Sequence, residues 1–526
     1  MAMKNEPKAL PYQVLRARLG RVCVAVIGES INEMLDTAEL AFKENPFLEF
    51  RLDYLDKPLL ALPKLKKFLY ENSLVTAIAT CRRSANGGKF KGSAAAQLEV
   101  LHKAIEAGCQ MVDIELESAK SLKKPAMDHL REMAAVVLSF HDFEGTKDLD
   151  ETYQQMRKFT PDYYKVVSTA KTLADNVTMI RFLEKTHDEA DMVGICMGDA
   201  GIISRVLGVR AGSRFTFAAA SVGEETAPGQ IAARTLREVY RIDQVDAATK
   251  VYGVAGDPVK HSLSPTMMNM AFRRETVNAV YLALHSHKVK DLMTLVREIP
   301  LQGVSVTMPL KQEMMKQVER TDPLSAKIGA LNTVVRSQDG KLFGFNTDVN
   351  GILTPLEQRL VLRGAKVLVL GAGGAARAAV FALKERGAEV FVLNRTALTG
   401  QKLAREAKVK TFKKDQLAKA SWDVILNATP VGMAGYKTQS WLDAKELNAK
   451  YVFDMVYEPV ETPLLRMARQ RGCQVITGIE MFVQQGAEQF QIWTGKPAPR
   501  DEMLRVVVHA VQQRAAETAK ATKPAK

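Results

Sequence analysis

The first half of the chain repeats one pattern, a short apolar run rich in β-branched residues followed by a stretch whose apolar residues recur at helical spacing. Such a run predicts a buried strand and the stretch after it an amphipathic helix, so each repeat is a βα unit. Eight consecutive units are typical of a (β/α)8 TIM barrel, and an open, doubly wound sheet is the alternative. The runs are residues 22–27, 47–52, 74–80, 111–116, 134–140, 163–167, 191–197 and 214–218.

Composition narrows the class of protein. The chain has 526 residues, 47% hydrophobic and 25% charged, which is enough to bury several cores. Its five cysteines form no CxxC pair, which argues against a disulfide framework or a cysteine zinc site and indicates a reducing cytoplasm. The N-terminus lacks the apolar core of a signal peptide, and no later stretch reads as a membrane span. We therefore expect a cytoplasmic protein with no membrane segment and no metal.

A net charge of +14 indicates anionic partners, which include nucleic acid, acidic lipid and small carboxylates or phosphates. The sequence contains no basic stripe interleaved with aromatic residues, so small anions are favoured and nucleic acid is not expected. Nothing in the sequence indicates the oligomeric state.

Polar residues gather where the predicted barrel strands end, which is where barrels of this type place their active sites. Surface ion pairs for the arginines and a structural role for the histidine are the alternatives. The residues are Glu49, Arg51, Arg82, His141, Lys165, Arg205 and Gln230.

Lys165 lies within the run YYKVV, whose aromatic and β-branched residues favour the neutral, nucleophilic amine by desolvation. Such a lysine can form a Schiff base with a ketone, although a lysine that snorkels from a strand end has the same pattern. With His141 as general acid and base, and arginines able to bind a carboxylate, the residues indicate imine-assisted elimination or aldol-type chemistry on a keto acid.

Five motifs together resemble type I 3-dehydroquinate dehydratase across residues 20–240: EFRLD (49–53), SFHDF (139–143), YYKVV (163–167), ISR (203–205) and TAPGQ (226–230). The resemblance implies that Lys165 forms the imine with the substrate C3 carbonyl. It also implies that His141 removes the C2 proton and delivers it to the leaving hydroxyl. The substrate-binding positions that it implies are Glu49, Arg51, Arg82, Arg205, Thr226 and Gln230.

One position departs from that family. The loop after the third strand has Asn86 before Gly87 and Gly88, where the family usually carries a glutamate that pairs with the histidine. A carboxylate would raise the pKa of the imidazole, whereas an amide can orient the ring without adding charge. We hypothesise a working but retuned base at His141.

The second half contains a glycine turn of dinucleotide-binding type. Gly371, Gly373 and Ala376 follow a predicted strand and open a predicted helix, so the backbone can approach a pyrophosphate there. About 20 residues on, NAD-binding chains place an acidic residue for the ribose, but this chain has Asn394, Arg395 and Thr396. An arginine with flanking polar groups suits a 2′-phosphate, so NADP is favoured over NAD.

A second polar set precedes that turn. It contains Ser262, Ser264, Thr307, Lys311, Asn332 and Asp348. These groups suit a polyhydroxy acid, and Lys311 and Asp348 can pass the proton that accompanies hydride transfer. Each residue taken singly is also typical of a turn or a helix cap.

With NATPVGM (427–433), DMVY (454–457) and GIEMFVQQGAEQF (478–490), this set resembles shikimate dehydrogenase over residues 250–515. The resemblance implies that Ser262 and Ser264 hold the substrate carboxylate and that Lys311 is the catalytic acid and base. Thr307, Asn332, Asp348 and Gln485 would bind ring hydroxyls, with Tyr457 near the substrate. The implied NADP side is Gly371, Ala372, Gly373, Gly374, Ala375, Asn394, Arg395, Thr396, Met455 and Gly478.

These resemblances predict a dehydratase barrel over residues 1–246. They further predict a substrate-binding domain over 250–355, completed by 480–515, a Rossmann-like NADP-binding domain over 356–479 and a disordered tail over 516–526. Since the first product, 3-dehydroshikimate, is the second substrate, we expect a bifunctional enzyme that converts 3-dehydroquinate to shikimate. The alternatives are a quinate/shikimate dehydrogenase with a weakened dehydratase half, and a non-catalytic regulator that senses quinate-like ligands. Ser264 and Thr307 favour shikimate over quinate.

Overall fold

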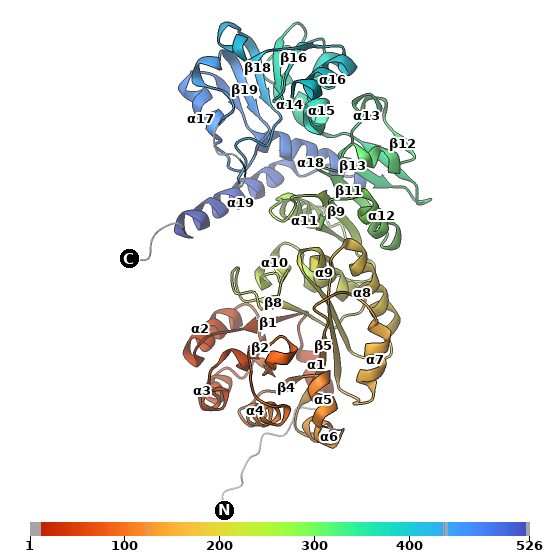
Figure 1. The fold of residues 1–526 in the computed structure, drawn as a ribbon, viewed down its shortest axis with the longest axis vertical. Helices are drawn as coiled ribbons and strands as arrows, with labels where there is room; N and C mark the ends of the chain where they lie inside the picture. Colours follow the sequence, from red (N-terminus) through yellow and green to blue (C-terminus); the bar gives the residue numbers. More distant parts are fainter. Residues whose placement is uncertain (1–11, 123, 435, 437–439, 522–526) are drawn as a thin grey trace, which may run out of the picture. The chain divides into compact units, whose positions relative to one another are not determined.

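The computed structural model describes residues 12–122, 124–434, 436 and 440–521 (Figure 1). The chain divides into two compact units, one built mainly from the residues up to Thr249 and the other mainly from those after it.

The first unit is a nearly closed barrel of eight strands. All neighbouring strands pair in parallel in the order β7-β6-β5-β4-β3-β2-β1-β8, and β1 pairs with both β2 and β8. This arrangement confirms the predicted barrel and shows that the open-sheet alternative was wrong. The strands are β1 (Val22–Val26), β2 (Phe47–Arg51), β3 (Thr76–Thr80), β4 (Met111–Glu115), β5 (Ala135–His141), β6 (Tyr163–Thr169), β7 (Met192–Met197) and β8 (Thr216–Ala219).

Most helices of this unit lie outside these strands (Figure 1). Several begin where a side-chain oxygen caps the first turn, as Ser30 does for α2 and Ser93 for α4. The helices are α1 (Tyr12–Arg18), α2 (Ile31–Phe42), α3 (Pro58–Glu71), α4 (Ala94–Glu106), α5 (Leu116–Leu122), α6 (Lys124–Met133), α7 (Leu149–Arg157), α8 (Leu173–Thr186), α9 (Ile202–Arg210) and α10 (Ala233–Glu238).

The two ends of the barrel differ in chemistry. Phe47, Met111 and Tyr163, the first residues of β2, β4 and β6, belong to one apolar cluster with Leu15 of α1. The carboxyl ends of the same strands carry Arg51, Glu115 and other polar groups. Because the amino end is filled by apolar side chains, the polar site lies at the carboxyl end, as the (β/α)8 fold predicts.

The second unit contains a mixed six-stranded sheet ordered β10-β9-β11-β13-β14-β12. Its strands are β9 (Lys250–Gly256), β10 (Ala279–His285), β11 (Leu301–Val306), β12 (Arg320–Thr321), β13 (Thr333–Arg336) and β14 (Leu342–Phe345). Its helices are α11 (Ser264–Arg274), α12 (Val289–Glu298), α13 (Pro323–Ile328) and α14 (Asp348–Glu357).

A parallel six-stranded sheet, ordered β17-β16-β15-β18-β19-β20, follows in the same unit. The continuous apolar strand β15 is buried on both faces, because Val367 and Val369 pack in a cluster with α14 to α16, and Leu368 and Leu370 in one with α17. This Rossmann-like sheet confirms the predicted fold class. Its elements are β15 (Lys366–Leu370), α15 (Gly374–Glu385), β16 (Glu389–Leu393), α16 (Ala397–Ala407), β17 (Lys410–Thr411), β18 (Trp422–Asn427), β19 (Ala449–Asp454), α17 (Pro463–Gln470) and β20 (Gln474–Ile476).

The chain then returns to the mixed sheet through α18 (Gly478–Thr494) and α19 (Arg500–Ala521). Phe490, Trp493 and Val507 of these helices join Tyr252 and Phe272 in one buried cluster. Residues 516–521 are helical, which differs from the disordered tail expected from residue 516 onward, and residues 522–526 lie outside the described part.

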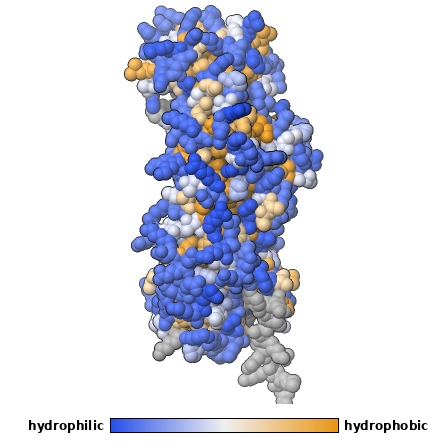
Figure 2. Space-filling view, turned by 90° about the vertical axis from the view of Figure 1, so that its right-hand side faces the viewer, coloured by the Kyte–Doolittle hydropathy of each residue, from blue (hydrophilic) through white to orange (hydrophobic). Residues whose placement is uncertain are grey.

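The surface of the face seen in Figure 2 is mostly hydrophilic, with scattered apolar patches. Among the described helices, none combines the length and the apolar composition that a bilayer crossing requires.

Candidate active sites

In the barrel, Lys165 is buried at 4% exposure with its ammonium against two carboxylates. Nζ lies 2.8 Å from Asp113 Oδ2 and 3.6 Å from Glu49 Oε1, and 3.7 Å from the centroid of the Phe217 ring. The run YYKVV shows apolar neighbours only, and Glu49 was predicted at the same end of the barrel, but Asp113 was not, because it comes from another strand. A carboxylate in hydrogen-bond contact can accept the proton that the amine must lose before it attacks a carbonyl.

Asp113 and Glu115 are functional candidates that the sequence pattern did not single out. Burial opposes ionisation of Asp113, but Lys165, Arg82 and the Ser139 hydroxyl, whose Oγ donates at 2.6 Å, hold the pKa of this carboxyl below its ordinary value. Burial raises the pKa of Glu115. A signal was available: two acidic residues alternate in the run MVDIEL, on a strand predicted to be buried.

His141 ends β5 and stacks on Phe143, with ring centroids 6.1 Å apart. Burial, together with the cations Arg82, Lys165 and Arg51, lowers the pKa of this imidazole well below its ordinary value. The ring is therefore neutral near pH 7, as a proton acceptor must be. Its Nδ1 is buried and makes no hydrogen bond with the described residues.

Asn86 makes no hydrogen bond with that nitrogen. Its Oδ1 accepts a hydrogen bond from Arg83 at 3.3 Å, so the expected amide orientation of the His141 ring is not seen. The loop acts on the ring indirectly: Gly87 lies so close to Phe143 that a Cβ atom there would come within 2.2 Å of the Phe143 ring.

The predicted anion-binding residues form two groups. Arg51 is held by a bidentate pair with Asp53, whose two oxygens each lie 2.9 Å from the guanidinium, and Arg82 lies 3.5 Å from Asp113. Arg205 is different, because burial lowers its pKa to about 10 and its nitrogens donate only to the carbonyls of Phe217 and Pro228 among the described residues. A buried guanidinium of this kind is suited to an anionic ligand.

Thr226 and Gln230 lie in the same loop as Pro228. The backbone N–H and the hydroxyl of Thr226 donate to Gln230 Oε1 at 2.6 and 3.1 Å. The fold thus brings Arg205 beside the loop that holds both residues, as the resemblance implied, and their roles in binding stay predictions.

The second unit holds another paired amine. Lys311 is hydrogen-bonded to Asp348 Oδ2, while Asn332 Nδ2 donates to the other oxygen of Asp348 at 2.8 Å. Asn332 also lies 3.4 Å from Gln485 Oε1. Lys311 and Asn332 thereby meet at the Asp348 carboxylate, and Asn332 links it to Gln485 of α18.

The predicted substrate-binding residues with hydroxyl groups lie in three segments of this unit, which carry Ser262 and Ser264, Thr307, and Tyr457. Ser262 Oγ accepts a hydrogen bond from the Ser264 N–H at 3.2 Å. Tyr457 stacks on Phe482 with centroids 4.6 Å apart, and burial raises the pKa of its phenol. Thr307 follows β11 and packs against Gly256, where a Cβ would come within 2.5 Å of it.

The glycine turn fits a dinucleotide. Gly371 has a φ of +113°, and α15 begins at Gly374 with its first N–H groups directed out of the helix. A Cβ at Gly373 would meet nothing within 4 Å, so open space lies where a pyrophosphate would approach. The Lys311 stem lies 3.1 Å from the Cβ position of Gly374, which joins the turn to the paired amine.

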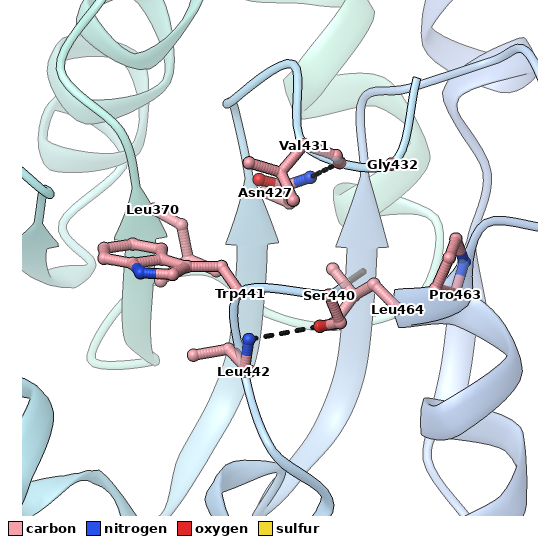
Figure 3. A pocket seen from close by; sticks show the side chains of 9 residues that line it. All are labelled: Leu370, Asn427, Val431, Gly432, Ser440, Trp441, Leu442, Pro463 and Leu464. Carbon is pink, nitrogen blue, oxygen red and sulfur yellow. Dashed lines mark hydrogen bonds between the residues drawn. The ribbon is translucent and has the colours of Figure 1, made fainter. Parts of the chain in front are cut away.

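The remaining predicted NADP residues lie on the same sheet edge. Arg395 follows β16 and is exposed, and Asn394 Nδ2 donates to the Thr396 carbonyl at 2.9 Å. Gly478 begins α18 with its Cβ position 2.6 Å from the Met455 carbonyl oxygen. None of these residues lines the small cavity of Figure 3, which Leu370, Trp441 and Leu464 enclose with other mostly apolar groups.

Four models of known protein families match separate stretches of the chain. Residues 22–247 match the model of type I 3-dehydroquinase, and residues 254–334 that of the shikimate dehydrogenase substrate-binding domain. Residues 356–453 match shikimate/quinate 5-dehydrogenase, and residues 478–508 the shikimate 5′-dehydrogenase C-terminal domain.

Three similar proteins illustrate the match. A Pyrococcus furiosus shikimate dehydrogenase (NADP(+)) is 39% identical over 51% of this chain and 99% of its own length. The solved shikimate 5-dehydrogenase of Thermus thermophilus, in complex with NADP(H) and shikimate, is 36% identical over 50% of this chain and 100% of its own, with a TM-score of 0.47. The chloroplastic bifunctional 3-dehydroquinate dehydratase/shikimate dehydrogenase of Arabidopsis thaliana is 32% identical over 91% of this chain and 83% of its own length. The chain therefore belongs to the family of bifunctional 3-dehydroquinate dehydratase/shikimate dehydrogenases.

Proposed function

We propose that the first unit dehydrates 3-dehydroquinate to 3-dehydroshikimate and that the second reduces this product to shikimate with NADPH. The observation that carries the proposal is that each unit holds an amine paired with a buried carboxylate, Lys165 with Asp113 and Lys311 with Asp348, among polar groups suited to a hydroxy acid.

In the dehydratase step, Lys165 gives a proton to Asp113 and its amine attacks the C3 carbonyl, from which water leaves as the imine forms. His141 then removes the C2 proton, and the imine nitrogen takes up the electron pair. The imidazolium returns that proton to the leaving hydroxyl, which departs as water. Hydrolysis of the imine releases the product and frees Lys165, so the net change is the loss of one water. Arg205, Thr226 and Gln230 hold the anionic end of the substrate in this proposal.

In the second step, NADPH when bound supplies a hydride to the carbonyl carbon. The residues of this chain handle the proton and the binding. The Lys311 ammonium, held by Asp348, donates its proton to the carbonyl oxygen as that oxygen gains charge. Ser262 and Ser264 bind the carboxylate, while Asn332, Thr307, Asp348 and Gln485 bind ring hydroxyls. Arg395 and the N-terminus of α15 take the phosphates.

Two assays test this proposal on the whole chain. Borohydride reduction in the presence of 3-dehydroquinate is expected to trap an adduct on Lys165, and not in K165A. Shikimate is expected to drive formation of NADPH, and not in K311A. A protein that forms no adduct and makes no shikimate-dependent NADPH would contradict the enzymatic proposal and favour the non-catalytic regulator.

One observation favours a second candidate, a shikimate or quinate dehydrogenase with a weak dehydratase half. His141 Nδ1 is buried without a hydrogen bond to the described residues, and Asn86 leaves it without a carboxylate. This candidate would be supported if borohydride traps the adduct while the dehydratase turnover is far below the dehydrogenase turnover.

The buried and free state of all five cysteines supports a reducing compartment, so we propose a cytoplasmic location and small-molecule partners only. Cell fractionation tests the first point. A DNA-binding titration at about 150 mM salt tests the second, since binding there would contradict it.

A further inference from the structure

Arg514 of helix α19 contacts two segments that carry predicted residues of the dehydrogenase site. Arg514 Nη1 donates to the His261 carbonyl at 2.7 Å and lies 3.0 Å from Glu458 Oε2. The side chains of Arg514 and Glu458 are 34% and 21% exposed, so this pair is partly shielded from water.

The two partners of Arg514 flank residues of the site. His261 directly precedes Ser262, and Glu458 directly follows Tyr457. One guanidinium therefore ties the segment that carries the serines to the segment that carries the tyrosine, although almost 200 residues separate them in sequence.

A second link joins the same two segments. The Tyr457 ring stacks on Phe482 of α18, with centroids 4.6 Å apart. Burial raises the pKa of its phenol, and Ser262 and the Leu263 backbone are near enough to offset part of that rise. Tyr457 and Ser262 thus stay close to each other only while their segments keep their spacing. Because α19 is anchored in the buried cluster through Met503, Val507 and Val511, it offers a fixed point for that spacing.

We propose that Arg514 is a positioning residue of the dehydrogenase site, which sets Ser262, Ser264 and Tyr457 to receive the substrate carboxylate. This inference rests on the proposed function. A partly exposed ion pair contributes little to folding stability. We therefore expect loss of the Arg514–Glu458 pair to change the geometry of the site more than the stability of the fold. Arg514 acts on the substrate through the two segments that it joins.

Steady-state kinetics of R514M test the proposal. The KM for shikimate is expected to rise about tenfold, with kcat and the KM for NADP changed less than about twofold, since ground-state binding of the carboxylate is what the misplaced hydroxyls lose. R514K, which can still donate to both partners, is expected to recover part of the loss. The melting temperature, together with the kcat and the KM for NADP of the same variant, reports whether the dehydrogenase unit is folded.

Two further variants distinguish positioning from simple charge attraction. R505M removes an exposed arginine from the same helix and is expected to leave every constant unchanged. E458Q removes a negative charge: if Arg514 acted only by attracting the anionic substrate, this variant would lower the KM for shikimate, whereas positioning predicts a rise. R514M/E458Q should then lose less than the product of the single losses.

An unchanged KM for shikimate in R514M would overturn the inference alone, as would a fall in KM in E458Q. Loss of kcat and of NADP binding in parallel with a fall in melting temperature in R514M would also overturn it, because the arginine would then be structural. Wild-type protein without shikimate oxidation would overturn the proposed function, and the inference with it.

Discussion

His141 illustrates how much the chemistry of one residue depends on its neighbours. Its pKa is lowered from an ordinary value of 6.5 by burial and by three cations, and no carboxylate of the described residues hydrogen-bonds to its Nδ1. The imidazole therefore stays neutral, and competent to accept a proton, at pH values well below that ordinary pKa. The dehydratase should accordingly keep its kcat/KM as the pH falls through 6.5, and lose it only when the imidazole becomes protonated.

N86E tests this directly through the pH dependence of kcat/KM for dehydration. A carboxylate near the ring is expected to raise the imidazole pKa and so move the acidic limb of the profile to higher pH. S84E adds the same charge at an exposed position of the same loop and should leave the limb in place. Identical profiles for N86E and the wild type would show that position 86 does not tune His141.

Asp113 lies 2.8 Å from Lys165 and is buried. D113N is expected to lower the dehydratase kcat by about 10²–10³-fold, because the amine loses the group that takes its proton. Dehydrogenase activity of the same variant should be unchanged and serves as the control. Full dehydratase activity in D113N would assign the proton to another acceptor, with Glu49 at 3.6 Å the next candidate.

At the scale of elements, the turn between β15 and α15 decides cofactor access. G373A places a methyl group in open space, so the unliganded fold should tolerate it. The same methyl group would stand where the pyrophosphate approaches, and the KM for NADP is expected to rise about tenfold or more.

Gly145 offers a matched control in the first unit, since a Cβ there also meets nothing within 4 Å and its φ is not in the left-handed region. G145A should leave the KM for NADP unchanged. If G373A had no effect on that KM while melting at the wild-type temperature, the turn would not be the pyrophosphate site.

On the scale of the whole molecule, the two chemistries belong to separate compact units. K165A is expected to abolish dehydration and leave shikimate oxidation intact, and K311A to do the reverse. An equimolar mixture of the two variants should then convert 3-dehydroquinate to shikimate with NADPH. The loss of NADPH absorbance measures this conversion. A mixture that failed although each variant kept its remaining activity would show that both sites must be on one chain.

The sequence by itself determined the βα period and the glycine turn, and it supplied most of the candidate site residues, because strand and helix spacing and phosphate-binding turns are local patterns. Lys165, His141, Lys311 and Asp348 stand in motifs that can be recognised without coordinates. The tertiary structure decided which residues pair with them by hydrogen bonds and ion pairs. Asp113 reaches Lys165 from another strand of the barrel, Asn86 turns to Arg83 instead of His141, and Arg514 joins two distant segments. Such contacts depend on strand register, barrel closure and helix docking, which sum interactions over the whole chain, so local spacing does not specify the pairing.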